Sequence, residues 1–310
     1  MFKKDIPLSK YSSYRIGGPA RYFYEAKNLE QLVSAVKKAR EENLPIFILG
    51  GGTNLVFSDY GFDGLVLKPK LLKMETESPV ITVQAGVSMS DLLEFAMEHG
   101  LSGLEWAGGL PGTLGGAVRG NAGAFKGEIK DLIQEVVSLW ISSGELKVIK
   151  RTNPECRFRY RDSVFKQNDG KEIILSVTLN MKQGDKKEIR EAMEEKIKYR
   201  EDRHPMEYPN VGSIFKNVDV SKISGKLRPI FQHVIKTDPF PVIPTAYLIA
   251  NAGLKGVSHG GAMISPKHPN FIVNVLNAKA EDVETLAQLV KATVKDKFGI
   301  VLEEEVIYVG

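Results

Sequence analysis

Hydrophobic periodicity at the start of the chain predicts strands that alternate with a helix. Residues 11–26 carry aromatic and apolar side chains on both sides of the Gly17-Gly18-Pro19 turn, a pattern typical of two short strands. Apolar residues then recur along residues 29–43 at the three- and four-residue spacing of one helix face. A short apolar run over 45–49 predicts the next strand. The order of these elements indicates an α/β opening.

The middle of the chain contains a second group of predicted strands. Ser88 begins a helical pattern that Gly100 ends, because serine caps the first turn of a helix and glycine stops the last. The segment Ser142-Ser143-Gly144 is typical of a hairpin turn between two strands. The apolar runs that predict strands lie at 64–68, 80–85, 135–140, 146–150 and 173–181.

The last third of the chain has a different character. Residues 185–203 are highly charged with one apolar stripe and predict an exposed amphipathic helix. A turn and a strand are expected at 208–217. Residues 218–247 contain four prolines and predict an irregular insertion. A second amphipathic helix over 280–298 precedes a final strand over 302–309.

Two glycine-rich segments stand between these elements. Gly103 to Gly127 contains nine glycines in 25 residues together with a tryptophan and several leucines, so we interpret it as packed backbone. Glycine permits positive φ and close approach, and a run of such positions exposes N–H groups that suit an anion such as a pyrophosphate. The turn Gly50 to Asn54 follows a strand, but Leu55 stands where a dinucleotide fingerprint needs glycine, and the chain has no P-loop motif. Thr53 and Asn54 suit phosphate oxygens or local backbone equally.

Composition adds few constraints. The 310 residues suggest about two domains, and 43% apolar with 26% charged residues is typical of a globular protein. The net charge of +4 is spread along the chain, so no basic tract argues for nucleic acid. Cys156 is the only cysteine, which excludes an intrachain disulfide and a cysteine-based zinc site. No apolar run approaches a membrane span of about 20 residues. We expect a cytoplasmic protein without metal or membrane partner.

Seven separated segments resemble one enzyme family in order along the chain. Each segment alone is weak, but together they cover nearly all residues except 218–247. The family is UDP-N-acetylenolpyruvoylglucosamine reductase, also called UDP-N-acetylmuramate dehydrogenase, and the chain is similar to the shorter form that lacks a tyrosine-bearing loop. The segments are ILGGGTNLVFSD (48–59), the stretch 103–127, FRYRDS (158–163), GSIFKN (212–217), AGLKGVSHGGAMIS (252–265), HPNFIVN (268–274) and FGIVLEEEVIYVG (298–310).

The resemblance implies an α+β protein with an FAD-binding fold of the vanillyl-alcohol-oxidase type and a C-terminal substrate-binding domain. Residues 1–70, joined by the C-terminal strand 303–310, and residues 71–184 would form two α/β subdomains around the flavin. Residues 185–302 would form an α+β substrate domain. Non-covalent FAD, reduced by NADPH, would serve to convert the enolpyruvyl sugar nucleotide to UDP-N-acetylmuramate for the bacterial cell wall, in a monomer.

The resemblance also implies roles for individual residues. Arg161 would stabilise the charge that forms on the substrate carboxylate, Ser213 would donate a proton to carbon, and Glu305 would polarise the intermediate. Arg203, where a lysine is more usual, and Asn217 would bind the sugar nucleotide. Without the family, Arg161 is a surface arginine, Ser213 a turn residue, and Glu305 one of three glutamates. The expected FAD-binding residues are Gly50, Gly51, Gly52, Thr53, Asn54, Leu55, Pro111, Gly112, Thr113, Gly115, Gly116, Ala117 and Asn121.

Two alternatives stay open from the sequence. Another FAD oxidoreductase of the same fold would keep both glycine segments without needing Arg161, Ser213 and Glu305 together. A catalytically silent flavin or sugar-nucleotide binding protein would keep the fold without turnover. The insertion 218–247 has two interpretations as well: it closes the substrate pocket, with Tyr247 as a contact, or it is a surface excursion.

Overall fold

The computed structural model describes residues 1–142, 144–238 and 240–310, and the chain forms two compact units that interleave along the sequence. Unit 1 consists of Met1–Ile6, Ala20–Gly51 and Asp63–Arg200. Unit 2 consists of Pro7–Pro19, Gly52–Phe62 and Glu201–Gly310. The first glycine turn therefore crosses from one unit to the other between Gly51 and Gly52.

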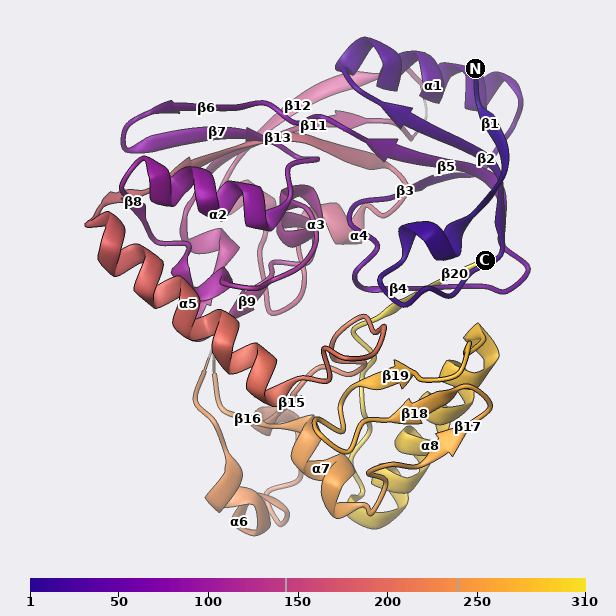
Figure 1. Cartoon of the computed structure of the whole chain (residues 1–310), viewed down its shortest axis with the longest axis vertical. Coiled ribbons are helices and arrows are strands. Elements are labelled where there is room, and N and C mark those ends of the chain that lie inside the picture. The colour runs from indigo at the N-terminus through magenta and orange to yellow at the C-terminus, as the bar shows by residue number, and fades with distance from the viewer. Residues whose placement is uncertain (143, 239) are drawn as a thin grey trace. The chain divides into compact units, whose positions relative to one another are not determined.

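The N-terminal part of unit 1 is a four-stranded sheet with one helix (Figure 1). The strands follow the order β1 (Lys3–Pro7), β2 (Pro19–Ala26), β5 (Phe62–Pro69) and β3 (Ile46–Ile48), with β3 parallel to β5. Helix α1 (Leu29–Glu41) begins at Asn28, whose side chain accepts a hydrogen bond from the Gln31 N–H. The apolar side chains of α1 are buried, as its periodicity predicted; they are Leu32, Ala35, Val36 and Ala39.

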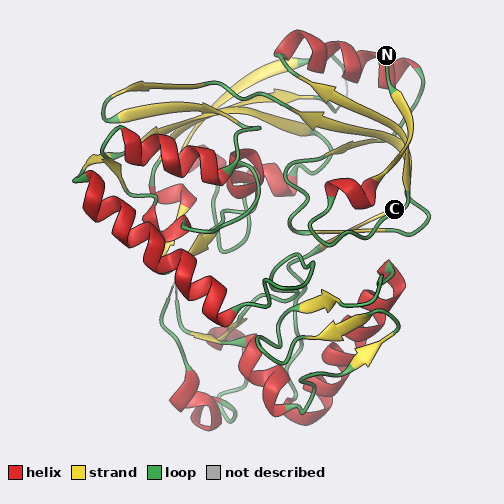
Figure 2. Cartoon of the chain, in the orientation of Figure 1, coloured by secondary structure: helices red, strands yellow, loops and turns green. Residues whose placement is uncertain are grey.

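The second part of unit 1 is an antiparallel sheet with short helices on one face (Figure 2). Helix α2 (Met89–Glu98) begins at Ser88, which accepts a hydrogen bond from the Asp91 N–H. The helices α3 (Leu114–Arg119) and α4 (Val164–Gln167) pack with α2 under β7 and β13 in one hydrophobic core. The strands lie in the order β12 (Lys147–Thr152), β11 (Ile133–Trp140), β13 (Glu172–Asn180), β7 (Val80–Gln84) and β6 (Met74–Glu77).

The long helix α5 (Lys186–Arg203) packs against the second glycine segment through its backbone. A Cβ on Gly108 would lie 2.5 Å from the Met193 carbonyl oxygen, and the Arg200 Nε donates to the Gly108 carbonyl at 2.8 Å. Most of the helix surface is exposed, as its charged sequence predicted. Short antiparallel pairs complete unit 1: β8 (Leu101–Ser102) with β14 (Lys182–Gln183), and β9 (Gly123–Ala124) with β10 (Gly127–Glu128).

Unit 2 is built around helix α8 (Ala280–Phe298) and a three-stranded antiparallel sheet. One face of α8 is buried with the strands β18 (Ala262–Ile264) and β19 (Ile272–Asn274), while β17 (Ser258–His259) forms the edge. Helix α7 (Thr245–Asn251) adds Leu248 and Ile249 to the same core. The C-terminal strand β20 (Ile307–Val309) pairs in parallel with β4 (Leu55–Phe57), a strand from the first fifth of the chain.

The insertion is more ordered than its prolines predicted. Strand β15 (Val218–Asp219) pairs with β16 (Val242–Ile243), and the segment between them contains helix α6 (Arg228–Phe231). Phe231 is buried, and its ring lies 5.9 Å from that of Phe298 on α8. Several residues of the insertion therefore belong to the core of unit 2, which the prediction of an irregular insertion did not anticipate.

Other local predictions differ from the structure because tertiary contacts override the pattern. Only β2 forms within residues 11–26, since Tyr14 is buried and its hydroxyl donates to the Ile272 carbonyl at 2.6 Å. The strand expected at 208–217 is reduced to a single bridge between Phe215 and Glu304. Strands β11 and β12 pair antiparallel, as the expected hairpin requires, but Ser143 of the predicted turn lies outside the described residues.

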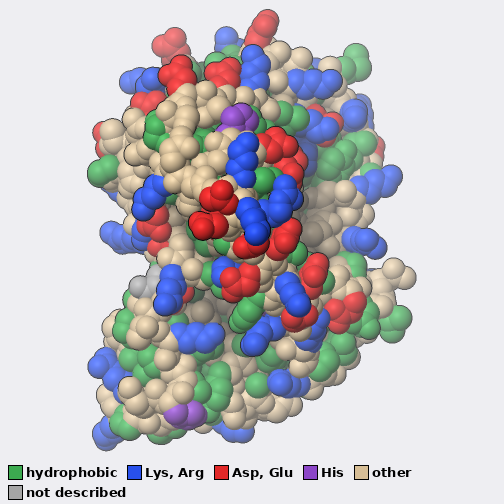
Figure 3. All heavy atoms as spheres, turned by 60° about the vertical axis from the view of Figure 1, so that its left-hand side comes forward, with side chains coloured by type: hydrophobic (Ala, Val, Ile, Leu, Met, Phe, Trp, Pro, Cys, Tyr) green, Lys and Arg blue, Asp and Glu red, His purple; other side chains and the backbone are tan. Residues whose placement is uncertain are grey.

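The surface is mixed in charge. On the face drawn in Figure 3, acidic and basic side chains are interspersed. Within the described ranges, no helix combines the length and the apolar character required to cross a bilayer.

Candidate active site

The two glycine segments meet within unit 1. A Cβ added to Gly51 would lie 2.6 Å from the Cα of Gly112, and one added to Gly50 would lie 2.9 Å from the Thr113 Oγ1. Distances this short do not occur for real side chains, so glycine is required at Gly51 for the two backbones to touch. The sequence predicted that both segments serve one anion, and their contact makes a shared ligand geometrically feasible.

Part of the second segment uses its N–H groups within the protein. The Gly115 N–H donates to the Ala85 carbonyl at 2.9 Å, and the Ala117 N–H donates to the Thr113 carbonyl at 2.9 Å. The Gly116 N–H donates to the Thr113 Oγ1, which caps α3. Of these three expected FAD contacts, Gly115 thus joins the second glycine segment to the residue after β7, while Gly116 and Ala117 form the first turn of α3. The N–H groups that precede them, at Gly112 and Thr113, lie at the contact with the first segment.

The second half of the first glycine turn belongs to unit 2. Gly52 has a φ of +67°, and a Cβ there would collide with the Tyr11 carbonyl oxygen. The Asn54 Nδ2 donates to the Glu305 carbonyl at 3.0 Å, and the Asn54 carbonyl accepts from the Ile307 N–H at 3.1 Å. Thr53 lies between Gly52 and Asn54 in the turn, and Leu55 begins β4. Asn54 therefore holds the segment that leads into the C-terminal strand, a contact with distant backbone that is neither the phosphate role nor the local-backbone role weighed from the sequence.

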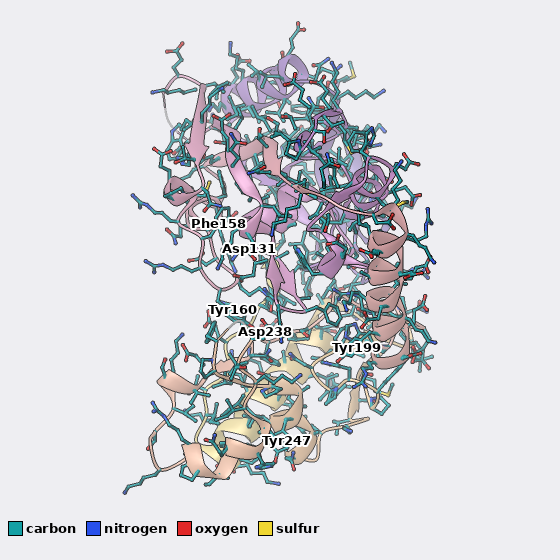
Figure 4. All side chains as sticks on the ribbon, turned by 90° about the vertical axis from the view of Figure 1, so that its left-hand side faces the viewer. Asp131, Phe158, Tyr160, Tyr199, Asp238 and Tyr247 are labelled. Carbon is teal, nitrogen blue, oxygen red and sulfur yellow. The ribbon has the colours of Figure 1, made fainter. Side chains whose placement is uncertain are left out.

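Arg161 lies in a tight turn of unit 1. Arg159 and Asp162 exchange both backbone hydrogen bonds, at 3.0 and 3.1 Å, and Arg161 between them has a φ of +54°. Its guanidinium donates from Nη2 to the Gly123 carbonyl at 2.7 Å and lies 5.0 Å from the Tyr160 ring centroid. Figure 4 labels Tyr160 on this turn. The arginine is thereby oriented by the second glycine segment rather than left as a mobile surface side chain.

Asn121 is hydrogen-bonded to the turn that contains Arg161. Its side chain is fully buried, and its Nδ2 donates to the Glu128 Oε1 at 3.1 Å and to the Arg159 carbonyl at 3.0 Å. Its Oδ1 accepts from the Lys130 N–H at 3.3 Å. Sequence reasoning assigned Asn121 to the flavin because it lies near the glycines. The hydrogen bonds give it a further role, since they connect the glycine segment to the turn of Arg161.

Ser213 and Glu305 are brought together in unit 2. The Asn210 Oδ1 accepts from the Gly212 N–H at 3.0 Å, and Gly212 has a φ of +82°, so the chain turns sharply just before Ser213. The carbonyl of the next residue, Ile214, accepts from the Glu305 N–H at 2.8 Å. Ser213 and Glu305, which are far apart in sequence, thus lie on neighbouring backbone segments.

The three consecutive glutamates have separate environments. Glu303 forms an ion pair with Lys216, and its other carboxylate oxygen lies 4.0 Å from the Lys222 Nζ. Glu304 faces Lys291 of α8 at 3.7 Å. Glu305 is half-buried beside the Ser213 segment and Asn54. Glu303 and Glu305 thus have different partners, a distinction that three consecutive glutamates in the sequence do not show.

The expected substrate-binding residues lie in different surroundings. Asn217 is half-buried, and its Oδ1 accepts from the Thr245 N–H at 3.1 Å at the first turn of α7. The Thr245 hydroxyl donates to the Lys216 carbonyl at 2.6 Å, which ties the GSIFKN segment to α7. Arg203 is the last residue of α5 and is exposed.

His268 is a residue to which the sequence gave no role. Burial lowers its pKa from 6.5 to about 4, with Lys236 adding a smaller effect in the same direction. Its ring lies 5.3 Å from that of His204 and 4.7 Å from that of Phe271. The chain therefore keeps this imidazole neutral at ordinary pH. Among the described residues, no group of three or more histidine, cysteine, aspartate or glutamate side chains has the arrangement of a metal site.

Comparison with known proteins supplies the family. Residues 20–149 match the FAD binding domain family, and residues 204–309 match the C-terminal domain of UDP-N-acetylenolpyruvoylglucosamine reductase. UDP-N-acetylenolpyruvoylglucosamine reductase of Caldanaerobacter subterraneus is 36% identical over 98% of this chain and 92% of its own length. The enzyme of the same name from Lactobacillus delbrueckii is 38% identical over 99% of this chain and 95% of its own length. The chain belongs to the UDP-N-acetylenolpyruvoylglucosamine reductase family.

A solved structure of this reductase family agrees with the fold. The crystal structure of UDP-N-acetylenolpyruvylglucosamine reductase from Thermus caldophilus superposes on this chain with a TM-score of 0.76 and 29% sequence identity. The match covers 100% of this chain and 100% of that chain. The family resemblance and the fold class that the sequence indicated are confirmed, as are an oxidoreductase function and FAD as its cofactor. The roles of individual site residues and the domain boundaries stay predictions.

Proposed function

We propose that this chain uses NADPH to reduce UDP-N-acetylenolpyruvoylglucosamine to UDP-N-acetylmuramate, a step of peptidoglycan precursor synthesis. The observation that carries the proposal is the likeness to reductases of this name over 98–99% of the chain. FAD, when bound, supplies the hydride that adds to the methylene carbon of the enolpyruvyl group. The protein's own residues must bind both ligands, hold the substrate carboxylate, and supply a proton.

The diphosphate of FAD would lie at the contact between the two glycine segments. The absence of side chains at Gly51 and Gly112 would let backbone N–H groups approach a shared anion, which is a common way for proteins to bind phosphate. We assign the N–H groups of Gly50, Gly51, Gly112 and Thr113 to this role. Those of Gly115 to Ala117 serve first to fold the segment, because they already donate to protein oxygens.

Arg161 would stabilise the charge that hydride addition creates. The methylene carbon is electrophilic only through conjugation with the carboxylate, so the added electron pair accumulates on the carboxylate oxygens. A fixed guanidinium lowers the energy of that intermediate more than a mobile one does, because no reorganisation is needed. The hydrogen bonds from Arg161 to the second glycine segment supply such fixation.

Ser213 would donate a proton to the neighbouring carbon, and Glu305 would polarise the reacting groups. A serine hydroxyl is a weak acid, so it needs a polar partner to act as a proton donor. The backbone pairing between the Ser213 segment and Glu305 supports a shared role within unit 2. Arg203 and Asn217 would bind the sugar nucleotide. Tyr247, at the end of the insertion, would contact it from α7. We further propose a monomeric protein of the cytoplasm.

The test follows NADPH consumption by absorbance, with and without the enolpyruvyl sugar nucleotide. We expect turnover only when NADPH and the enolpyruvyl sugar nucleotide are both present. Ser213→Ala should still allow NADPH to reduce the flavin but should lose most turnover, by about 100-fold or more. Full turnover in that variant would show that another group donates the proton. Flavin reduction without any response to the sugar nucleotide would favour a different substrate, and no reduction at all would favour a silent binding protein.

A further inference from the structure

Lys68 lies beside the contact of the two glycine segments. It is near the end of β5, which runs parallel to β3, and the Leu49 N–H donates to the Leu67 carbonyl at 2.9 Å. This pairing places the end of β5 next to the residue that begins the first glycine turn. The Lys68 Nζ donates to the Gly50 carbonyl at 3.2 Å.

The ammonium is thus one residue away from the place where the backbones touch. Gly50 itself approaches the Thr113 Oγ1, and Gly51 approaches the Gly112 Cα. All of these residues belong to unit 1. One small region of unit 1 therefore contains the Lys68 ammonium, the glycine backbone of both segments and the Thr113 hydroxyl.

Lys68 is also partly removed from water. Burial lowers its pKa, while nearby Glu25 raises it and Lys70 lowers it. Lys70 forms its own ion pair with Glu25, with 2.9 Å between Nζ and Oε1. An ammonium that has lost hydration gains more from an added anion than an exposed one does, because less water competes for either charge.

We infer that Lys68 is a cofactor-binding residue whose ammonium pairs with the diphosphate of FAD at the contact between the two glycine segments. This rests on the proposed position of the diphosphate. Backbone N–H groups offer only partial charges, whereas a diphosphate carries full negative charges, so a lysine supplies the compact counter-charge that glycines cannot. The hydrogen bond to Gly50 holds that charge in place before the cofactor binds.

The experiment measures the dissociation constants of FAD and of riboflavin, which lacks phosphate, on flavin-free protein by fluorescence. The variants are Lys68→Met, which removes the charge, and Lys68→Arg, which keeps it. Lys70→Met is the matched control, since Lys70 is a neighbouring lysine of unit 1 that is paired with Glu25. Circular dichroism checks the fold of each variant, and Lys68→Gln is the second neutral variant.

Lys68→Met should weaken FAD binding by about 10- to 100-fold, the scale of a charge-assisted hydrogen bond, and riboflavin binding by less than about threefold. Lys68→Arg and Lys70→Met should each stay within about threefold of the unaltered protein for FAD. Added salt should weaken FAD binding less in Lys68→Met, because one ionic contact is already gone.

Three results would overturn the inference. These are unchanged FAD binding in both neutral variants, an equal loss of FAD and riboflavin, or an unaltered dependence of FAD binding on salt. The last two would mean that Lys68 only shapes the glycine turn through Gly50. If the unaltered protein bound riboflavin as tightly as FAD, the placement of the diphosphate itself would be wrong, which is a failure of the proposed function rather than of Lys68.

Discussion

At the scale of single residues, the site depends on side chains that orient other groups. Asn121 is fully buried, and its side-chain amide donates to the Arg159 carbonyl in the turn of Arg161 and to the Glu128 carboxylate. Arg161 in turn is bonded to the carbonyls of Asn121 and Gly123. A sequence motif identifies the arginine, but the residue that holds its turn becomes visible only through these contacts.

Asn121→Ala should lower the free energy of unfolding by about 2–4 kcal/mol, because the Arg159 carbonyl and the Glu128 carboxylate lose a buried donor. Turnover should fall further than FAD affinity, since the turn of Arg161 loosens while the glycine contact remains. Urea unfolding and flavin titration measure the two effects. The exposed Asn180→Ala is the control. Equal losses of turnover and FAD affinity would contradict a role specific to Arg161.

His268 gives a residue-scale prediction on pH. Its pKa is about 4 in the folded protein against 6.5 as the ordinary value, so the unfolded chain binds more protons between these values. Stability that is present above pH ~6.5 should therefore be lost as the pH falls toward ~4, by at most about 3 kcal/mol. In His268→Gln this part of the pH dependence should vanish, whereas the exposed His99→Gln should retain it. Urea unfolding at several pH values provides the measurement.

At the scale of elements, close contacts between backbones decide the geometry of the site. Gly51 and Gly112 approach more closely than any side chain permits, and Gly115 bonds to Ala85 at the end of β7. These contacts join the turn after β3 to the segment before α3. Each glycine segment is recognisable by itself, but their meeting is a property of the folded unit.

Gly51→Ala should force these two segments apart, because the new methyl would lie 2.6 Å from a backbone atom that cannot rotate away. FAD binding should weaken by at least about tenfold, equivalent to about 1.4 kcal/mol. Gly225→Ala is the matched control, since nothing lies within 4 Å of a Cβ there. Flavin fluorescence titration decides the outcome. An alanine at residue 51 that leaves FAD affinity intact would remove the glycine contact from the cofactor site.

Phe231 tests whether the insertion is part of the core. It is 2% exposed and contacts Phe298 of α8, so Phe231→Ala should lower the free energy of unfolding by about 3–5 kcal/mol. Ile230→Ala, a neighbour that is 59% exposed, should change stability by less than about 0.5 kcal/mol. Chemical denaturation of both variants is the measurement. A small effect at Phe231 would restore the interpretation of a separate surface excursion.

At the scale of the whole molecule, the two units do not coincide with continuous stretches of sequence. Unit 2 contains Pro7–Pro19 and Gly52–Phe62 besides the last third of the chain. Tyr14 and Val56 belong to its hydrophobic core, and β20 pairs with β4. A sequence match that begins at residue 204 therefore omits part of the folded body.

A fragment of residues 201–310 alone should consequently be unfolded or strongly destabilised. It lacks β4, the partner of β20, and it lacks Tyr14, whose hydroxyl bonds to the Ile272 carbonyl. Limited proteolysis and circular dichroism, with the full chain as control, test this expectation. A cooperative unfolding transition in the fragment at the stability of the full chain would show that the N-terminal segments contribute nothing essential.

The sequence by itself determined the elements whose signals are local. Helices α1, α2 and α8 were predicted because capping residues and apolar spacing act within a few turns. The family was also identifiable, since its motifs are short and occur in order. The glycine segments predicted an anion site because a missing Cβ is a property of the residue itself, and that site stays a prediction.

The tertiary structure alone decided which groups meet. The burial of Tyr14 replaced an expected strand, Asn54 was directed to Glu305, and Lys68 was brought to Gly50. These contacts join residues far apart in sequence, and they form only after burial and hydrogen bonding elsewhere have fixed the backbone. Local periodicity holds no information about such distant partners, so the sequence could name the catalytic candidates but not the residues that position them.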